Sequence, residues 1–247
     1  MPKTLALTSY NHTLYEAYAH RFLDTYKGEL DLAIASEDQL PSLNGVLTLK
    51  MTAHQNFVKM NAWRRPRGYK QDAVRFCYKP YAIWTAMDSI RTSEEHNYTG
   101  LLWIDADTVF NKPITEEFVK EKLHTDGVMT YMGRPNYYSE TGVLYFNLEN
   151  PKTRDYVERV IELYNTNEIY ELPETHDSYV WDWVRTRMQT TLRGRPRALA
   201  TEFRNIGLPY KVPGGHIQSV LFGEYWDHLK GKRKQKGYSS ENAHTPR

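Results

Sequence analysis

The sequence predicts an α/β fold, in which one domain has a mostly parallel central sheet flanked by helices. Short apolar runs alternate with segments of helical period through the first half of the chain. The run Leu101-Leu102-Trp103-Ile104 is apolar at every position, as is typical of a strand covered on both faces. A length of 247 residues without linker or internal repeat suits a single Rossmann-like domain. We expect this domain at residues 1–236 and a flexible tail at 237–247.

The first hundred residues alternate between expected strands and expected helices. Four strands are predicted by their apolar runs, at residues 4–8, 31–35, 46–51 and 101–104. Apolar residues at helical spacing predict a helix over residues 14–26. A further helix is expected over residues 72–90, where Pro80 either kinks the helix or marks its start.

The second half of the chain carries clear signals for helix starts. Thr115 is a candidate N-cap, since two glutamates follow it in the first turn. Asn150 and Pro151 open a helix with an apolar face, and a tryptophan-rich helix is expected over residues 177–188. Strands are expected at residues 127–132 and 142–148.

Composition excludes several classes of protein. No apolar stretch is long enough to span a membrane, and the apolar run near the N-terminus is too short for the core of a signal peptide. We therefore expect a cytoplasmic protein. Cys77 is the one cysteine, which excludes an intrachain disulfide and a cysteine-based zinc site. Any bound metal must therefore be held by oxygen and imidazole ligands.

Basic charge is clustered although the net charge is only +2. The clusters lie at residues 64–67, 193–197 and 230–236. They suit phosphate, but solvated loops have the same composition. A nucleic-acid-binding module would carry a larger net positive charge, which disfavours that class.

Two aspartates follow the buried strand directly, in the sequence Asp105-Ala106-Asp107. Ligands of open α/β sheets lie beyond the carboxyl ends of the strands, and alternation places both carboxylates on one side of the chain. Mg²⁺ and Mn²⁺ prefer such oxygen ligands. The pattern thus predicts a divalent metal site, and a capped turn is the alternative.

A second constellation, His-x-x-Gly-x-x-Lys, begins at His228 near the C-terminus. An imidazole can complete a metal site with two carboxylates, and His216 is the rival ligand. Gly231 would let the backbone approach a phosphate, and Lys234 would supply a positive charge for it. A basic run that only keeps the chain soluble is the alternative.

Together the two motifs resemble those of the GT-A fold nucleotide-sugar glycosyltransferases, in particular the glycogenin-like and lipopolysaccharide galactosyltransferase-like retaining families. The resemblance implies that Asp105, Asp107 and His228 bind Mn²⁺ (or Mg²⁺). It also implies that Lys234 and the Gly231 backbone bind the diphosphate of the donor, with Ala106 as a further donor contact between the two aspartates.

The same resemblance implies roles for residues elsewhere. The turn after the first strand would bind the base through Thr8, Ser9 and Tyr10, and a basic pair, Arg75 and Lys79, would contact the donor. Three more residues would lie near the transferred sugar, Asp177 and Glu140 as catalytic residues and Gly142 as a contact to the donor. Asp177 could equally be only the N-cap of its helix.

The resemblance therefore implies metal-dependent transfer of a sugar from a nucleotide-sugar, most of all a UDP-sugar, to an acceptor hydroxyl with retention. A carbohydrate acceptor is expected before protein or DNA. The alternatives are a glycosyltransferase acting on modified DNA, a sugar nucleotidyltransferase and an inactive sugar-binding domain. The turn at residues 8–11 has no glycine for a phosphate loop, which disfavours the nucleotidyltransferase.

Overall fold

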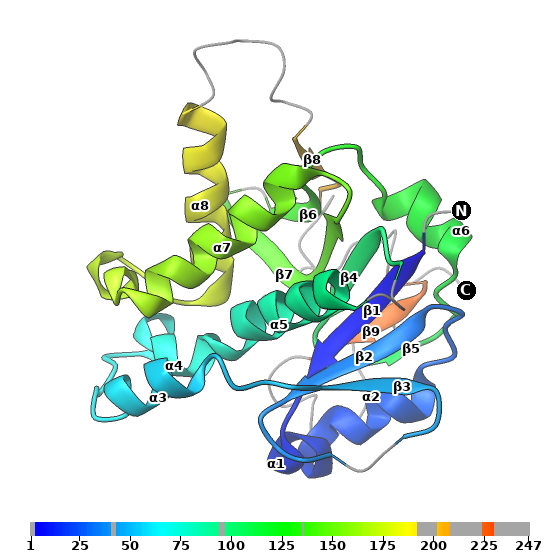
Figure 1. The fold of residues 1–247 in the computed structure, drawn as a ribbon, viewed down its shortest axis with the longest axis horizontal. Coiled ribbons are helices and arrows are strands. Elements are labelled where there is room, and N and C mark those ends of the chain that lie inside the picture. The colour runs from blue at the N-terminus through cyan, green and yellow to red at the C-terminus, as the bar shows by residue number, and fades with distance from the viewer. Residues whose placement is uncertain are drawn as a thin grey trace.

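The computed structural model describes residues 3–40, 43–93, 97–134, 136–191, 202–207 and 224–229. A seven-stranded sheet forms its centre (Figure 1). In chain order its strands are β1 (Thr4–Ser9), β2 (Asp31–Ser36), β3 (Val46–Lys50), β4 (Gly100–Ile104), β6 (Met129–Arg134), β7 (Tyr137–Asn147) and β8 (Phe203–Asn205). A separate ribbon pairs β5 (Thr108–Phe110) with β9 (Trp226–His228). The expected tail at 237–247 lies outside the described residues.

The strand order is β3-β2-β1-β4-β7-β6-β8. The pairs among β3, β2, β1 and β4 are parallel, and so is the pair of β6 with β8. Only β7 runs antiparallel to both of its neighbours, β4 and β6. The predicted α/β fold with a mostly parallel sheet is therefore confirmed.

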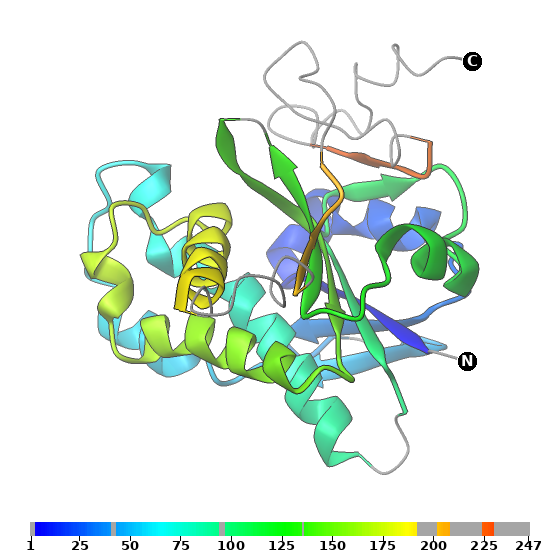
Figure 2. The same ribbon diagram turned by 90° about the horizontal axis from the view of Figure 1, so that it is seen from above.

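Helices cover the two faces of the sheet (Figure 2). Those with regular α geometry are α1 (His12–Leu14), α2 (His20–Thr25), α3 (Gln55–Asn61), α4 (Ala73–Phe76), α5 (Tyr78–Thr92), α6 (Glu116–Phe118), α7 (Pro151–Asn165) and α8 (Asp177–Thr191). Shorter helical segments are η1 (Tyr15–Ala19), η2 (Tyr69–Gln71), η3 (Val119–Leu123) and η4 (Glu168–Glu171). Among the residues that the structure describes, no helix combines the length and apolar character needed to cross a bilayer.

The core has two layers because alternate side chains of each strand point to opposite faces. Leu5 and Leu7 of β1 pack in the layer of α5, α7 and α8, whereas Ala6 packs with Phe22 of α2 and Phe118 of α6. All five residues are buried. A strand buried on both faces needs apolar residues throughout, which is the pattern that the sequence showed.

Most predicted helix starts are found. The Thr115 side chain accepts a hydrogen bond from the Phe118 amide at 3.0 Å, and the Asn150 side chain accepts one from the Lys152 amide at 3.0 Å. The helix expected over residues 72–90 is instead two helices, α4 and α5. Pro80 lies in the first turn of α5, where backbone amides have no acceptor within the helix. A proline there breaks no hydrogen bond, so Pro80 marks the start of α5 rather than a kink.

Strand β7 is longer than expected. It begins at Tyr137 rather than at Gly142. The added residues Ser139, Glu140 and Thr141 are polar but buried, so hydrophobicity did not reveal them. These residues reach the same edge of the sheet as the end of β4, because β7 pairs with β4 in antiparallel register.

Candidate functional site

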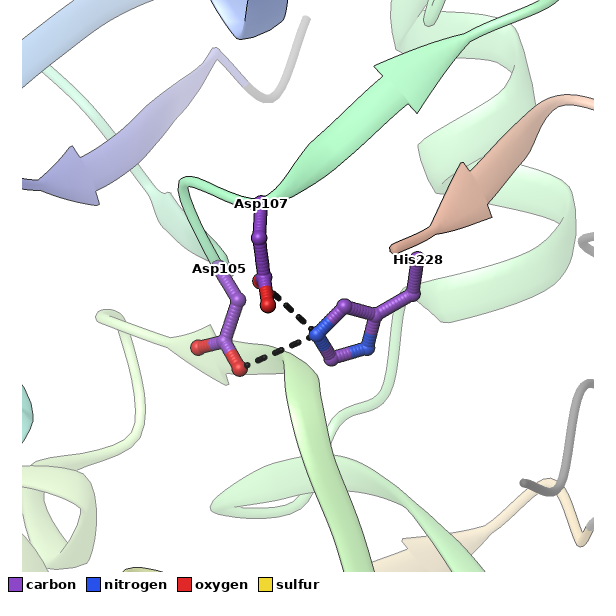
Figure 3. A group of neighbouring side chains, drawn as sticks. All are labelled: Asp105, Asp107 and His228. Carbon is purple, nitrogen blue, oxygen red and sulfur yellow. Dashed lines mark ion pairs between the residues drawn. The ribbon is translucent and has the colours of Figure 1, made fainter. Parts of the chain in front are cut away.

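Three metal-ligand side chains meet beyond the end of β4. Asp105 follows β4, Asp107 precedes β5, and His228 ends β9. The His228 Nε2 lies 2.9 Å from Asp107 Oδ1 and 3.5 Å from Asp105 Oδ2 (Figure 3). One ligand atom from each residue lies within 4.8 Å of the others. Two carboxylates and an imidazole in this arrangement can hold one divalent cation.

The pairing of β5 with β9 brings His228 to the aspartates. In this antiparallel ribbon His228 lies opposite Thr108, the residue after Asp107. The next backbone hydrogen bond runs from the Leu229 amide to the Asp107 carbonyl at 2.8 Å. A slip of one residue in this register would turn the imidazole away from the carboxylates. Backbone pairing thus fixes the position of His228, the third candidate ligand.

Gly142 leaves room for the imidazole. The Asp105 amide donates to the Gly142 carbonyl at 2.8 Å, so β7 passes directly beneath the cluster. A Cβ at Gly142 would lie 2.5 Å from His228 Nδ1 and closer still to Cε1. Gly142 was expected to contact the donor; in this structure its lack of a side chain leaves the space that the His228 imidazole occupies. Gly142 does not line the adjoining cavity.

Glu140 lies behind the imidazole, on the ring side away from the two aspartates. Its Oε1 is 3.8 Å from His228 Nδ1 and accepts a hydrogen bond from the Gly142 amide at 3.0 Å. Its Oε2 is 3.4 Å from Arg134 Nη1. The carboxyl group is buried and is not part of the cavity wall. Its position is that of an outer partner of a metal-bound histidine.

Lys79 connects the cluster to Asp177. The Lys79 ammonium lies 2.8 Å from Asp105 Oδ1 and 2.5 Å from Asp177 Oδ2, and it donates to the Thr141 carbonyl at 2.9 Å. Three acceptors match the three hydrogens of an ammonium group. Burial by itself lowers the pKa of Lys79, but the carboxylates of Asp105 and Asp177 outweigh it and raise that pKa above its ordinary value.

Asp105 presents its two oxygens to different partners. Oδ1 accepts a hydrogen bond from Trp103 Nε1 at 2.8 Å as well as the contact from Lys79, while Oδ2 faces His228. The carboxylate is thereby held in one orientation before any ligand binds. Such fixed first-ligand geometry is what a metal site requires.

Asp177 is the first residue of α8 and also faces the site. Its Oδ1 accepts from the Ser178 amide at 2.9 Å, and its Oδ2 accepts from the Thr141 hydroxyl at 2.9 Å. Burial by itself raises the pKa of Asp177, but the neighbouring Lys79 ammonium and these hydrogen bonds bring it below its ordinary value. The side chain therefore serves the start of the helix and remains an anion in the site.

A cavity of about 500 Å³ opens beside the cluster. Its wall contains most of the residues predicted for the site: Ser9, Tyr10, Arg75, Lys79, Asp105, Ala106, Asp107 and Asp177. Thr8 does not line it, because its side chain is buried in the sheet. Gly231, Lys234 and the rival ligand His216 lie outside the described residues.

Tyr10 and Tyr18 give the cavity an aromatic wall. Burial, followed by the neighbouring Tyr15, raises the pKa of Tyr10 to about 12. Burial and then the carboxylates of Asp107 and Asp105 raise the pKa of Tyr18 above its ordinary value. Both phenols are thus neutral hydrogen-bonding groups at physiological pH.

Sequence reasoning missed Glu37 and Tyr18. Glu37 lines the cavity just after β2, where Asn11 Nδ2 donates to its Oε1 at 3.0 Å and His54 Nε2 lies 3.3 Å from its Oε2. The rule that identified Asp105, a polar residue at the carboxyl end of a strand, applies equally to Glu37. Tyr18 gave no such signal, because its spacing is that of an apolar helix face.

Solved structures similar to this chain include glycosyltransferases. A glycosyltransferase involved in the glycosylation of the major capsid of PBCV-1 has a TM-score of 0.48 and 12% identity, covering 96% of this chain and 100% of that one. GlyE of Streptococcus pneumoniae TIGR4 has a TM-score of 0.48 and 11% identity over 83% of this chain, which spans 45% of that one.

The galactosyltransferase LgtC, solved with donor and acceptor sugar analogues, has a TM-score of 0.43 and 9% identity. The similarity covers 72% of this chain and 69% of LgtC. No protein-family model and no curated protein sequence matches the chain.

Proposed function

We propose that this protein is a metal-dependent glycosyltransferase that moves a sugar from a nucleotide-sugar donor to an acceptor hydroxyl. One observation carries the proposal: in the cluster of Asp105, Asp107 and His228, both aspartates line a cavity of about 500 Å³, and Asp105 also contacts the Lys79–Asp177 pair. The site thus combines a place for a cation with a place for a polar substrate.

The residues present fit a divalent cation such as Mn²⁺ or Mg²⁺. Hard oxygen atoms from two carboxylates and one imidazole nitrogen are ligands that Mn²⁺ accepts, and Gly142 provides the space that the imidazole occupies. When bound, such an ion supplies positive charge to a departing diphosphate. Asp105, Asp107 and His228 would hold it.

Lys79 organises the carboxylates of the site. All three of its N–H groups are directed at Asp105, Asp177 and Thr141. We expect it to fix the two aspartates and to offset their mutual repulsion, so the donor contact predicted for the basic pair falls to Arg75, whose exposed side chain lines the cavity.

Asp177 is suited to the sugar end of the donor. It stays ionised at neutral pH, since its pKa is lowered, and it lies on the cavity wall. A fixed carboxylate can accept hydrogen bonds from sugar hydroxyls and can stabilise positive charge that develops at the anomeric carbon. Ser9 and Tyr10, at the end of β1, would bind the base, for which we propose uracil.

The retaining outcome implied by the sequence resemblance is part of this proposal. A retaining route needs the leaving phosphate or a carboxylate near the anomeric carbon to assist the acceptor hydroxyl. Asp177 lines the cavity, and we propose it as that carboxylate. The anomeric configuration of the product, read by NMR at early times, tests this directly, and an inverted product would refute retention.

Calorimetric titration of UDP, GDP, CDP and TDP, each with and without Mn²⁺, tests the donor site. We expect micromolar binding of one nucleotide, UDP, that disappears when Mn²⁺ is withheld. Hydrolysis of the matching nucleotide-sugars then identifies the sugar. Binding that is equally tight in excess chelator would refute the metal assignment, and absence of binding under every condition would refute the donor site.

A further inference from the structure

Three exposed hydrophobic side chains lie within ten residues of one another in the chain. The described chain exposes four large hydrophobic residues, of which Met60 (51% exposed), Trp63 (70%) and Tyr69 (62%) fall within ten residues at the end of α3. Arg65 and Arg67, both exposed, lie between Trp63 and Tyr69. We call these five residues the Trp63 surface. Clustered exposed hydrophobic residues mark an interaction site more often than isolated ones do.

The Trp63 surface lies in a segment of one charge sign. Residues 39–71 contain six lysines and arginines and no aspartate or glutamate. Three of these cations have partners: Lys50 donates to the Glu37 carbonyl at 2.6 Å, Lys70 pairs with Glu174 at 2.9 Å, and Arg64 stacks on the Tyr170 ring at 3.8 Å.

Arg65 and Arg67 have no carboxylate partner within the described ranges. Arg65 Nη1 contacts only the Ala62 carbonyl, at 3.5 Å, and no hydrogen bond or ion pair of Arg67 is found there. The guanidinium groups of Arg65 and Arg67 are therefore available to bind an anionic partner.

The hydrophobic side chains distinguish between anionic partners. Trp63 Nε1 donates to the Met60 carbonyl at 2.9 Å, so the polar atom of the indole is satisfied; the Arg64 guanidinium lies 4.9 Å from the ring centre, and most of the side chain remains exposed. An exposed methionine gains little from a phosphate backbone, whereas a lipid bilayer offers both an apolar layer for Met60 and Trp63 and phosphates for the arginines. A nucleic acid would use the arginines and rings but not Met60.

We propose that the Trp63 surface binds the headgroup region of an anionic membrane, with Met60 and Trp63 inserted and Arg65 and Arg67 on lipid phosphates. The segment that carries this surface is tied to the segment that enters the cavity wall: the Thr175 amide donates to the Lys70 carbonyl at 2.7 Å, and Asp177, two residues after Thr175, lines the cavity. Membrane binding would hold the cavity beside the bilayer. The inference stands independently of the proposed sugar transfer.

Co-sedimentation of the full chain with vesicles tests this proposal. Vesicles of phosphatidylcholine with phosphatidylserine are compared with vesicles of phosphatidylcholine alone, at low and high salt. We expect binding to the anionic vesicles that high salt weakens. The double variant Arg65→Gln/Arg67→Gln should bind roughly thirtyfold more weakly, the loss expected for two basic side chains near an anionic surface. Trp63→Ala should also weaken binding.

A matched control removes the same charge elsewhere. Lys120→Gln/Lys122→Gln alters η3, which continues α6 on the far side of the molecule from α3 in both views (Figures 1 and 2). This variant should bind the anionic vesicles within twofold of the unaltered chain, a difference that corresponds to under about 0.5 kcal/mol. All the substituted side chains are exposed or half-exposed, so the variants should fold.

Three outcomes would overturn the proposal. The first is absence of binding to anionic vesicles. The second is an equal loss of binding in the control variant, which would indicate a general charge effect. The third is salt-dependent binding of a DNA oligonucleotide through Arg65 and Arg67 without vesicle binding, which would assign the surface to nucleic acid instead.

Discussion

Substitution of Gly142 by alanine should weaken Mn²⁺ binding by displacing the His228 imidazole. The new Cβ would lie 2.5 Å from His228 Nδ1, about 1 Å inside the separation at which non-bonded atoms stop repelling. The imidazole must therefore move by about 1 Å, whereas its present distance to Asp107 Oδ1 is 2.9 Å. Disturbing the support of a metal ligand typically weakens metal binding 10- to 100-fold, or about 1.4–2.8 kcal/mol.

Titration of Mn²⁺ into Gly142→Ala, followed by calorimetry, measures this loss. Gly133→Ala is the matched control, since a Cβ there would lie 2.5 Å from Asn205 Nδ2 on a different part of the sheet. We expect this control to lose stability but to keep its Mn²⁺ affinity. The two variants distinguish displacement of His228 from general strain in the sheet.

A double-mutant cycle with His228→Ala makes the test stricter. If Gly142→Ala acts by displacing the imidazole, it should have little further effect on Mn²⁺ affinity once the imidazole is removed. Full additivity of the two losses would refute the reasoning, and so would an unchanged Mn²⁺ affinity in Gly142→Ala.

Three other predictions concern the charged groups. Lys79→Met leaves the Asp105 and Asp177 carboxylates without their cation and should reduce the free energy of unfolding by about 3 kcal/mol, measured by urea denaturation; a stability equal to that of the unaltered chain would contradict this. Because the pKa of Asp177 is lower in the folded than in the unfolded chain, its stabilising contribution is complete above its ordinary pKa and is lost as pH falls below about 4. Stability of Asp177→Asn should thus fall less steeply in that range, and parallel pH curves would contradict it. Asp107→Ala should abolish Mn²⁺-dependent nucleotide binding in calorimetry, and retained binding would exclude Asp107 as a ligand.

Local sequence signals singled out the three candidate metal ligands that the structure brings together, because two independent rules pointed to them. Asp105 and Asp107 follow a strand that is apolar at every position, and the structure places them beyond the carboxyl end of β4 as the rule for open sheets requires. His228 came from its motif, and the structure brings its ring to the two aspartates. Glu37 obeys the same strand-end rule and could have been found.

The contacts that Lys79, Glu140 and Gly142 make in the site could not be predicted from local sequence signals. Lys79 was expected to contact a donor, and its position between Asp105 and Asp177 depends on the packing of α5 and α8 at the edge of the sheet. Glu140 and Gly142 were expected to line the sugar, yet they lie behind and beneath His228. These placements arise from contacts between segments that are far apart in the chain.

The sequence by itself determined the α/β class, the helix caps at Thr115 and Asn150, and the candidate metal ligands, because hydrophobic period, capping chemistry and strand ends are local properties. Only the tertiary structure decided that β7 enters antiparallel beside β4 and that β9 pairs with β5 in the register that aims His228 at Asp107. The physical reason is that hydrogen bonds between strands have nearly the same local requirements in either direction and in any register. The choice among them is made by the packing of the whole domain.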